Sequence, residues 1–202
     1  MGGSGAPALT AEPLVGVLAL QGDFEAHGGV LRRLGARVRE VRVVEDLDGI
    51  AALVIPGGES TTMTFGVERE GLAEPLRALV ADGLPVLGSC AGLIMLDRAH
   101  LGLMDMRAQR NAFGRQIKSF EADIDVAGLA GGPLHGVFIR APWIAEHGDG
   151  VEILAVLDGH PVAAREGRVL AVAFHTELTG EDRLHEMLLE WARSAGAPTP
   201  RG

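Results

Sequence analysis

The sequence predicts a single α/β domain built on a mixed, mostly parallel sheet that helices cover on both faces. Strand-like runs alternate with helix-like patterns through the first half of the chain, which is typical of α/β proteins. These runs are continuously apolar rather than alternating, as expected of strands that are buried on both faces. The 202 residues suffice for one core, and no internal repeat or central linker divides them.

The first half of the chain is expected to alternate four strands with two helices. We expect the helices over Glu25–Leu34 and Leu72–Asp82, the second leading through Gly83 into the next buried strand. The expected strands are Val15–Leu20, Val38–Val44, Ala51–Ile55 and Pro85–Gly88.

The second half is richer in strands, which predicts that the sheet is mixed. Apolar residues recur at helical spacing over Asp182–Ala195 and predict a final helix that packs on the sheet. The domain is therefore expected over residues 14–195, between flexible tails at 1–13 and 196–202. The expected strands are Ala122–Val126, Gly136–Arg140, Val151–Leu157, and a hairpin that joins Pro161–Arg165 to Val169–Phe174 across Glu166-Gly167.

The composition argues against several classes of protein. A formal net charge of −9 and an isoelectric point near 5.2 disfavour broad binding to the phosphates of nucleic acid. No apolar stretch reaches the roughly 18 to 20 residues of a membrane-spanning helix, and the first residues do not resemble a secretory signal. A single cysteine allows neither an internal disulfide nor a thiolate zinc cluster. We therefore expect a soluble protein of the reducing cytoplasm.

The segment Gly88-Ser89-Cys90-Ala91-Gly92 has the pattern of a nucleophile elbow. A buried strand runs into it and a helix follows, and glycines two residues on either side of Cys90 permit a sharp turn. The start of the helix would favour the thiolate form of Cys90. An isolated cysteine is usually a small buried hydrophobe. The surrounding turn favours a nucleophile instead.

A second polar pair follows the last predicted strand. His175-Thr176-Glu177 comes directly after the buried run that ends at Phe174, and alternation would put His175 and Glu177 on the same side. Glu177 would then orient the imidazole, while His175 takes the proton of a nucleophile and returns it to a leaving amine. Polar residues at strand ends also serve merely to cap loops.

The glycine-rich segment Pro56-Gly-Gly-Glu-Ser60 follows a third buried strand. Its backbone N–H groups at Gly57 and Gly58, with that of Ala91 after the cysteine, are candidate donors to an oxyanion. The alternative is an ordinary tight turn with Ser60 capping the next helix. Phosphate and metal sites are less favoured, because the chain lacks a Walker lysine, a GxGxxG turn and an HExxH pair.

Together PGGEST, GSCAGLI and FHTELT resemble the triad-type, or class I, glutamine amidotransferase domain. The wider motifs LQGD from Leu20, RNAFGRQ from Arg110, SFE from Ser119 and GVFIRAP from Gly136 are similar to the glutaminase subunits of pyridoxal 5'-phosphate synthase. The resemblance covers about residues 14 to 190. The chain departs from that family's pattern in two places, with Ser89 in place of threonine and Thr176 in place of proline.

The resemblance implies a flavodoxin-like fold and the hydrolysis of glutamine, with ammonia passed to a synthase subunit in a hetero-oligomeric complex. No cofactor is implied. Cys90, His175 and Glu177 match the catalytic triad, and Gln21 matches the LQG motif as a candidate relay between the partner and the oxyanion loop. The positions that match glutamine binding are Gly58, Glu59, Ser60, Arg110, Ile139 and Arg140.

Three alternatives stay open. The first alternative is a glutaminase of another pathway, since a triad alone does not name the acceptor of ammonia. A second alternative is a catalytically silent regulatory subunit, although an intact Cys-His-Glu set argues against it. The third is a cysteine peptidase or small-molecule hydrolase on a similar fold. Residues of both charges around a small pocket favour a free amino acid over a peptide.

Overall fold

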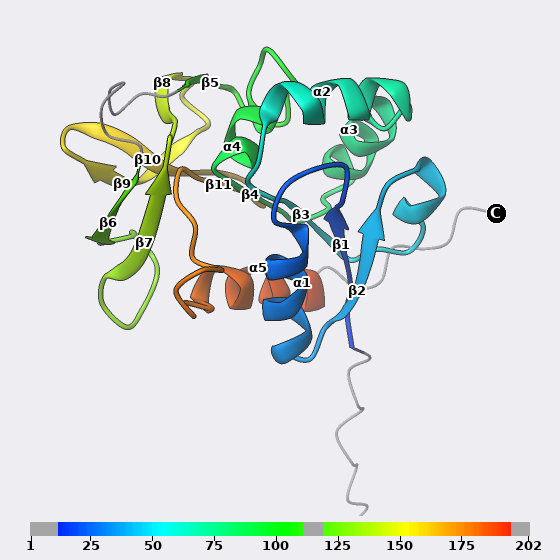
Figure 1. Cartoon of the computed structure of the whole chain (residues 1–202), viewed down its shortest axis with the longest axis horizontal. Coiled ribbons are helices and arrows are strands. Elements are labelled where there is room, and N and C mark those ends of the chain that lie inside the picture. The colour runs from blue at the N-terminus through cyan, green and yellow to red at the C-terminus, as the bar shows by residue number, and fades with distance from the viewer. Residues whose placement is uncertain (1–11, 111–118, 195–202) are drawn as a thin grey trace, which may run out of the picture.

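A computed structural model describes residues 12–110 and 119–194 (Figure 1). Its centre is a seven-stranded sheet in the order β2-β1-β3-β4-β11-β10-β9. The first five strands are mutually parallel, and β10 and β9 continue the sheet antiparallel. The mixed, mostly parallel sheet that the sequence predicts is thus confirmed. The strands are β1 (Leu14–Leu18), β2 (Arg37–Val41), β3 (Ala52–Ile55), β4 (Val86–Ser89), β9 (Glu152–Leu157), β10 (His160–Glu166) and β11 (Val169–Val172).

Helices cover both faces of this sheet, as the apolar strands require. Figure 1 shows α1 (Phe24–Arg33) and α5 (Arg183–Ser194) on one face. The other face carries α2 (Ser60–Arg69), α3 (Ala73–Ala81) and α4 (Ala91–Leu96). The apolar stripe of α5 is buried, as its helical spacing predicts. None of the helices in the described ranges is long and apolar enough to cross a membrane.

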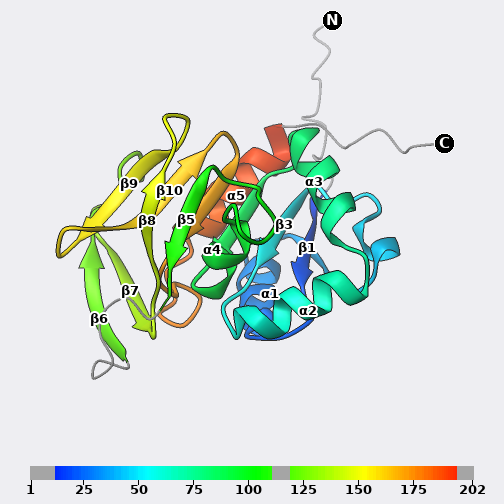
Figure 2. The ribbon, with the colours of Figure 1, turned by 90° about the horizontal axis from the view of Figure 1, so that it is seen from above.

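Two small antiparallel sheets lie at the β9 end of the main sheet, away from β2 (Figure 2). One pairs β6 (Ser119–Ile124) with β7 (Leu134–Ile139), and the other pairs β5 (Met106–Gln109) with β8 (Trp143–His147). The sequence analysis did not predict β5 and β8. Each strand is short and mostly exposed or half-buried, and its partner is remote in sequence, so neither has the apolar run of a buried strand.

The boundaries of several predicted elements differ from the structure. The strand expected to reach Val44 ends at Val41, because Val44–Leu47 forms a 3₁₀ turn that the Asp46 carboxylate stabilises by accepting from Arg42 N and Val43 N. The last strand ends at Val172 rather than Phe174. Both predicted tails lie outside the described residues, apart from positions 12 and 13, and so do positions 111–116 of the RNAFGRQ motif.

Candidate active site

Cys90 stands in the sharp turn between β4 and α4 with φ 50° and ψ −105°, a backbone conformation that residues other than glycine rarely adopt. The turn needs its glycines: a Cβ atom at Gly88 would lie 2.8 Å from the Gly92 carbonyl oxygen. At Gly92 a Cβ would lie 2.0 Å from the Ile55 carbonyl oxygen. The Cys90 N–H donates to Val172 O at 2.8 Å, so the turn is also tied to β11. The predicted elbow is therefore present as a strained, tightly packed turn.

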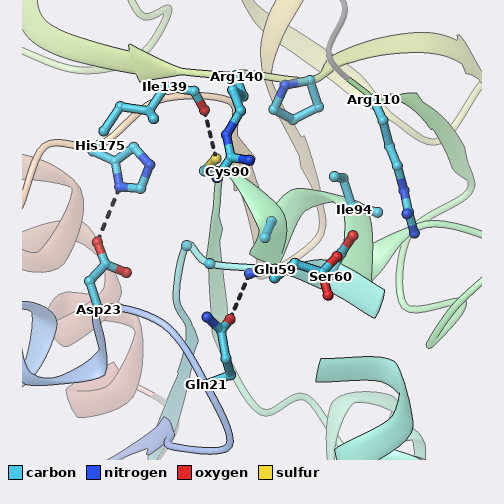
Figure 3. Close-up of a pocket in the computed structure, with 14 residues that line it drawn as sticks. Gln21, Asp23, Glu59, Ser60, Cys90, Ile94, Arg110, Ile139, Arg140 and His175 are labelled. Carbon is cyan, nitrogen blue, oxygen red and sulfur yellow. Dashed lines mark hydrogen bonds and ion pairs between the residues drawn. The ribbon is translucent and has the colours of Figure 1, made fainter. Parts of the chain in front are cut away.

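His175 and Glu177 meet in the turn after β11. The Nδ1 atom of His175 lies 2.5 Å from Glu177 Oε1, and the Glu177 side chain is fully buried. Since the strand ends at Val172, the contact comes from this turn and not from the strand alternation that the sequence suggested. The backbone of His175 is held separately, by two hydrogen bonds with Val137 of β7. Figure 3 shows the imidazole beside Cys90.

The surroundings of His175 favour its charged form. Burial lowers its pKa, but hydrogen bonds with Asp23, Cys90 and Glu177 outweigh this effect and raise the pKa of His175 to about 12. Burial raises the pKa of Glu177, and the neighbouring Asp23 carboxylate adds to that rise. An imidazolium next to Cys90 stabilises a thiolate, which is the reactive form of cysteine.

The glycine-rich segment packs directly against the imidazole. Gly57 is buried, and a Cβ atom there would lie 2.3 Å from His175 Cε1. The Gly57 carbonyl accepts from the N–H of Asp23 at 3.3 Å. Gly58 has φ +148°, and the Gln21 Oε1 atom beside it accepts from Glu59 N at 2.6 Å. The turn after β1 thus holds the segment in place, and Gln21 lies where a relay to it would have to be.

A cavity of about 390 Å³ opens at the carboxyl ends of these strands (Figure 3). Its volume falls in the usual range of small-molecule sites. Cys90, Ala91 and His175 line it, together with Gln21, Asp23 and Gly57. Glu177 is not among the lining residues and lies behind His175. The cavity also brings together every residue matched to glutamine binding, namely Gly58, Glu59, Ser60, Arg110, Ile139 and Arg140.

Charged groups of both signs line the cavity. Hydrogen bonds from the Thr62 hydroxyl and from the backbone N–H groups of Thr61 and Thr62 lower the pKa of Glu59 to about 2, so its carboxylate is ionised at neutral pH. Glu59, and not Ser60, is therefore the residue that caps α2. The Arg110 guanidinium reaches the same helix, since its NH1 group donates to Thr61 Oγ1 at 3.2 Å.

Sequence reasoning missed the residues that hold Arg110. Its NH2 group lies 3.2 Å from His100 Nε2, and His100 Nδ1 lies 2.7 Å from Asp97 Oδ1. Asp97 is buried at the end of α4, where its carboxylate also accepts from the N–H groups of Ala99 and Ala108. Because arginine is always a donor, His100 Nε2 accepts and its Nδ1 carries the proton. The only sequence signal was the spacing of three between Asp97 and His100.

The sequence also showed no sign of a buried polar network that lies behind His175 and Glu177. His27 of α1 lies 3.0 Å from Ser89 Oγ and 2.9 Å from His185 of α5. Its Nε2 atom is 3.6 Å from Glu177 Oε1. Asp23, His27 and Glu177 bring three possible metal-ligand atoms within 4.8 Å of one another, but these atoms already contact His175, Ser89 or one another. We assign the cluster to the support of the imidazole.

Comparisons with known proteins show which family and which solved structures the chain resembles. The model of the SNO glutamine amidotransferase family matches residues 17–193. A protein of Mycolicibacterium vanbaalenii named pyridoxal 5'-phosphate synthase subunit PdxT is 51% identical, over 88% of this chain and 96% of its own length. A protein of the same name from Clavibacter sepedonicus is 52% identical, over 91% and 93%. A crystal structure described as glutamine amidotransferase superposes with a TM-score of 0.83 at 49% identity, over 88% of this chain and 98% of that one.

Proposed function

The chain belongs to the SNO glutamine amidotransferase family, and from this premise we propose that it is the glutaminase subunit of a pyridoxal 5'-phosphate synthase. It hydrolyses L-glutamine to L-glutamate and ammonia. The observation that carries the assignment to this chain's own residues is the strained Cys90 turn beside a buried His175–Glu177 pair, in a cavity of amino-acid size.

The reaction runs in two halves through a thioester. The Cys90 thiolate adds to the carboxamide carbon of glutamine, and the oxygen becomes an oxyanion that backbone N–H groups at Gly58 and Ala91 stabilise. The imidazolium of His175 protonates the nitrogen, the carbon–nitrogen bond breaks and ammonia leaves. Neutral His175 then takes a proton from water, whose oxygen attacks the thioester. Glutamate is released and the thiolate and imidazolium are restored.

The charges of the cavity select a free amino acid. Arg110 or Arg140, which both line the cavity, is the proposed partner of the α-carboxylate, and ionised Glu59 is the proposed partner of the α-ammonium. Ile139 borders the nucleophile: the thiol of Cys90 donates to its carbonyl oxygen at 3.7 Å, a hydrogen bond that is lost when the thiolate forms. An internal glutamine of a peptide carries neither the α-ammonium nor the α-carboxylate, so the same set of groups disfavours a peptidase.

The ammonia acceptor is a synthase subunit in a hetero-oligomeric complex of the cytoplasm, without nucleic acid or membrane. Relatives that are about half identical carry the name of such a subunit. Uncoupled hydrolysis would waste glutamine, so the isolated chain is expected to be a poor glutaminase that the partner activates. A flip of the Gly57–Gly58 peptide is the proposed switch, because one oxyanion donor is worth about 100- to 1,000-fold in rate. Gln21, bonded to the next residue of this loop, is the proposed relay.

The test is glutamate release by the chain alone and with saturating cognate synthase, repeated with Gln21→Ala. We expect low activity alone, strong activation by the partner and weaker activation of the variant. Full activity without the partner would refute the coupling. Normal activation of the Gln21 variant would remove that residue from the mechanism. No hydrolysis of glutamine under any condition would refute the function itself.

A further inference from the structure

We propose that Asp23 is a positioning residue for His175. The Asp23 carboxylate shares the Nδ1–H of His175 with Glu177 and is the second carboxylate in contact with the imidazolium. The inference rests on the proposed function, because it gives a role to a residue that acts through the general base. Figure 3 shows Asp23 in contact with the His175 ring, where Oδ2 lies 3.2 Å from Nδ1. Glu177 contacts the same ring nitrogen.

The position of Asp23 in the fold makes this contact informative. Asp23 is the N-cap residue of α1, a place where aspartate normally accepts from the first backbone N–H groups of its own helix. Its side chain makes no such hydrogen bond. It turns instead into the cavity wall toward His175, and its other oxygen, Oδ1, is buried without a hydrogen-bond partner among the described residues. The helix thus forgoes a stabilising cap, and the carboxylate serves the imidazole.

The charges around His175 explain why one carboxylate is insufficient. The titratable groups that face it are Glu177 from its own segment, Asp23 and His27 from the start of α1, and Cys90 from the elbow. Burial favours the neutral form of Glu177 and raises its pKa. Burial also raises the pKa of Asp23, but hydrogen bonds with His175 and Glu177 outweigh it and hold that pKa well below its usual range. The Asp23 side chain is 28% exposed and that of Glu177 is fully buried, so ionisation costs Asp23 less desolvation than it costs Glu177.

The backbone of Asp23 adds a second link. Its N–H donates to the Gly57 carbonyl at 3.3 Å, while its side chain contacts His175. A Cβ atom on the preceding residue, Gly22, would lie 1.8 Å from the same carbonyl oxygen, so the close approach requires glycine. One residue thus positions the imidazole and hydrogen-bonds the carbonyl of the Gly57–Gly58 peptide, whose N–H is the Gly58 oxyanion donor and whose flip is the proposed switch.

The direct test follows the protonation of His175 by NMR of the imidazole nitrogens in Asp23→Asn. Asparagine keeps the size and is a good N-cap, so the fold is preserved. Loss of a carboxylate in contact with the ring lowers its pKa by about 1 to 3 units, so the imidazolium should lose its proton at a lower pH than in the wild type. Asp23→Ser, which also caps helices, should behave alike. Glu25→Gln, an exposed carboxylate in the first turn of the same helix, should leave the titration unmoved. An unshifted titration in both Asp23 variants would overturn the proposal.

A second measurement asks whether the two carboxylates share one task. With saturating synthase, Asp23→Asn should lower kcat several-fold without raising KM, and move the alkaline limb of the rate profile to lower pH. In a Glu177→Gln background, where Asp23 is the remaining charge, the same change should cost about tenfold more. An equal factor in both backgrounds, or an effect on KM alone, would contradict the shared role. The NMR arm needs neither substrate nor partner, so it is independent of whether the chain hydrolyses glutamine.

Discussion

His175 lines the cavity, and His100 contacts Arg110, which also lines it. Each histidine has its Nδ1 atom on a carboxylate, Glu177 at 2.5 Å and Asp97 at 2.7 Å. They differ in what the remaining ring nitrogen meets. In His175 that nitrogen is left for Cys90, a group that gains and loses a proton. In His100 it meets Arg110, which stays charged. The same pair of residue types therefore serves proton transfer in one place and orientation of a substrate anchor in the other.

The largest effect is expected from removing the Cys90 thiol, the group with which the His175–Glu177 pair exchanges a proton. Cys90→Ala should abolish glutamine hydrolysis with the fold intact, because the new side chain is smaller and the other nucleophilic group of the elbow, the Ser89 hydroxyl, is buried against His27. Glutamate release and circular dichroism check both parts. A glutamine-like electrophile should label the wild type at Cys90, its single cysteine. Turnover by a folded variant, or a label at another residue, would show that His175 serves another group.

The next largest effects distinguish the role of His175 from that of Glu177. His175→Asn should lower kcat by about 100- to 10,000-fold, since it removes the proton-transfer group. Glu177→Gln should cost less, because packing and Asp23 still hold the imidazole. Steady-state rates with saturating synthase decide the order. A larger loss for the glutamate variant would reverse the roles given to the two residues.

Substitutions of Arg110 and of His100, which contacts it, should raise KM and leave kcat unchanged. Arg110→Ala should raise KM by about 10- to 100-fold, as expected for loss of a charge-assisted hydrogen bond to a part of glutamine that does not react. His100→Phe leaves the guanidinium in place but loosens it, so KM should rise about fivefold. The matched control is His147→Phe, because His147 is an exposed histidine of β8. A fall confined to kcat in the His100 variant would make the two histidine pairs alike in function.

The smallest effect concerns the two buried histidines behind the cavity, His27 and His185. Burial lowers the pKa of His27 to about 3, with a further contribution from His185, and burial lowers that of His185 to about 4. Unfolding lets both take up protons below their ordinary value of 6.5, so stability is lost as the pH falls from about 6.5 to 4. His175, whose pKa is raised, contributes stability that is instead lost as the pH rises above 6.5.

We expect the free energy of urea unfolding to fall by about 2 to 4 kcal/mol between pH 7 and pH 5. His27→Asn should roughly halve that fall, whereas His147→Asn should leave it unchanged. The measurement compares the two pH values within each variant, which cancels the cost of the substitution itself. An undiminished pH dependence in the His27 variant would mean that the histidine pair does not set the acid sensitivity.

The sequence by itself determined the parts of the site that depend on local backbone geometry. The glycines around Cys90 specify a sharp turn between a buried strand and a helix, and the spacing of His175 and Glu177 lets their side chains meet within one turn. The tight turn at Gly57-Gly58 is likewise predicted by its two consecutive glycines after a buried strand. The α/β order of the elements was readable for the same reason, since apolar runs and helical spacing are local patterns.

Only the tertiary structure decided which distant residues support these groups. The bonds of His27 to Ser89 and to His185 span 62 and 158 positions of the sequence. The β5–β8 pair and the contact between Asp23 and His175 also join residues that are remote in sequence. Such contacts depend on strand order: β1, β3, β4 and β11 lie side by side, so the turns after their carboxyl ends converge on one cavity. No local pattern encodes which strands become neighbours, because that order is settled by how the whole core packs.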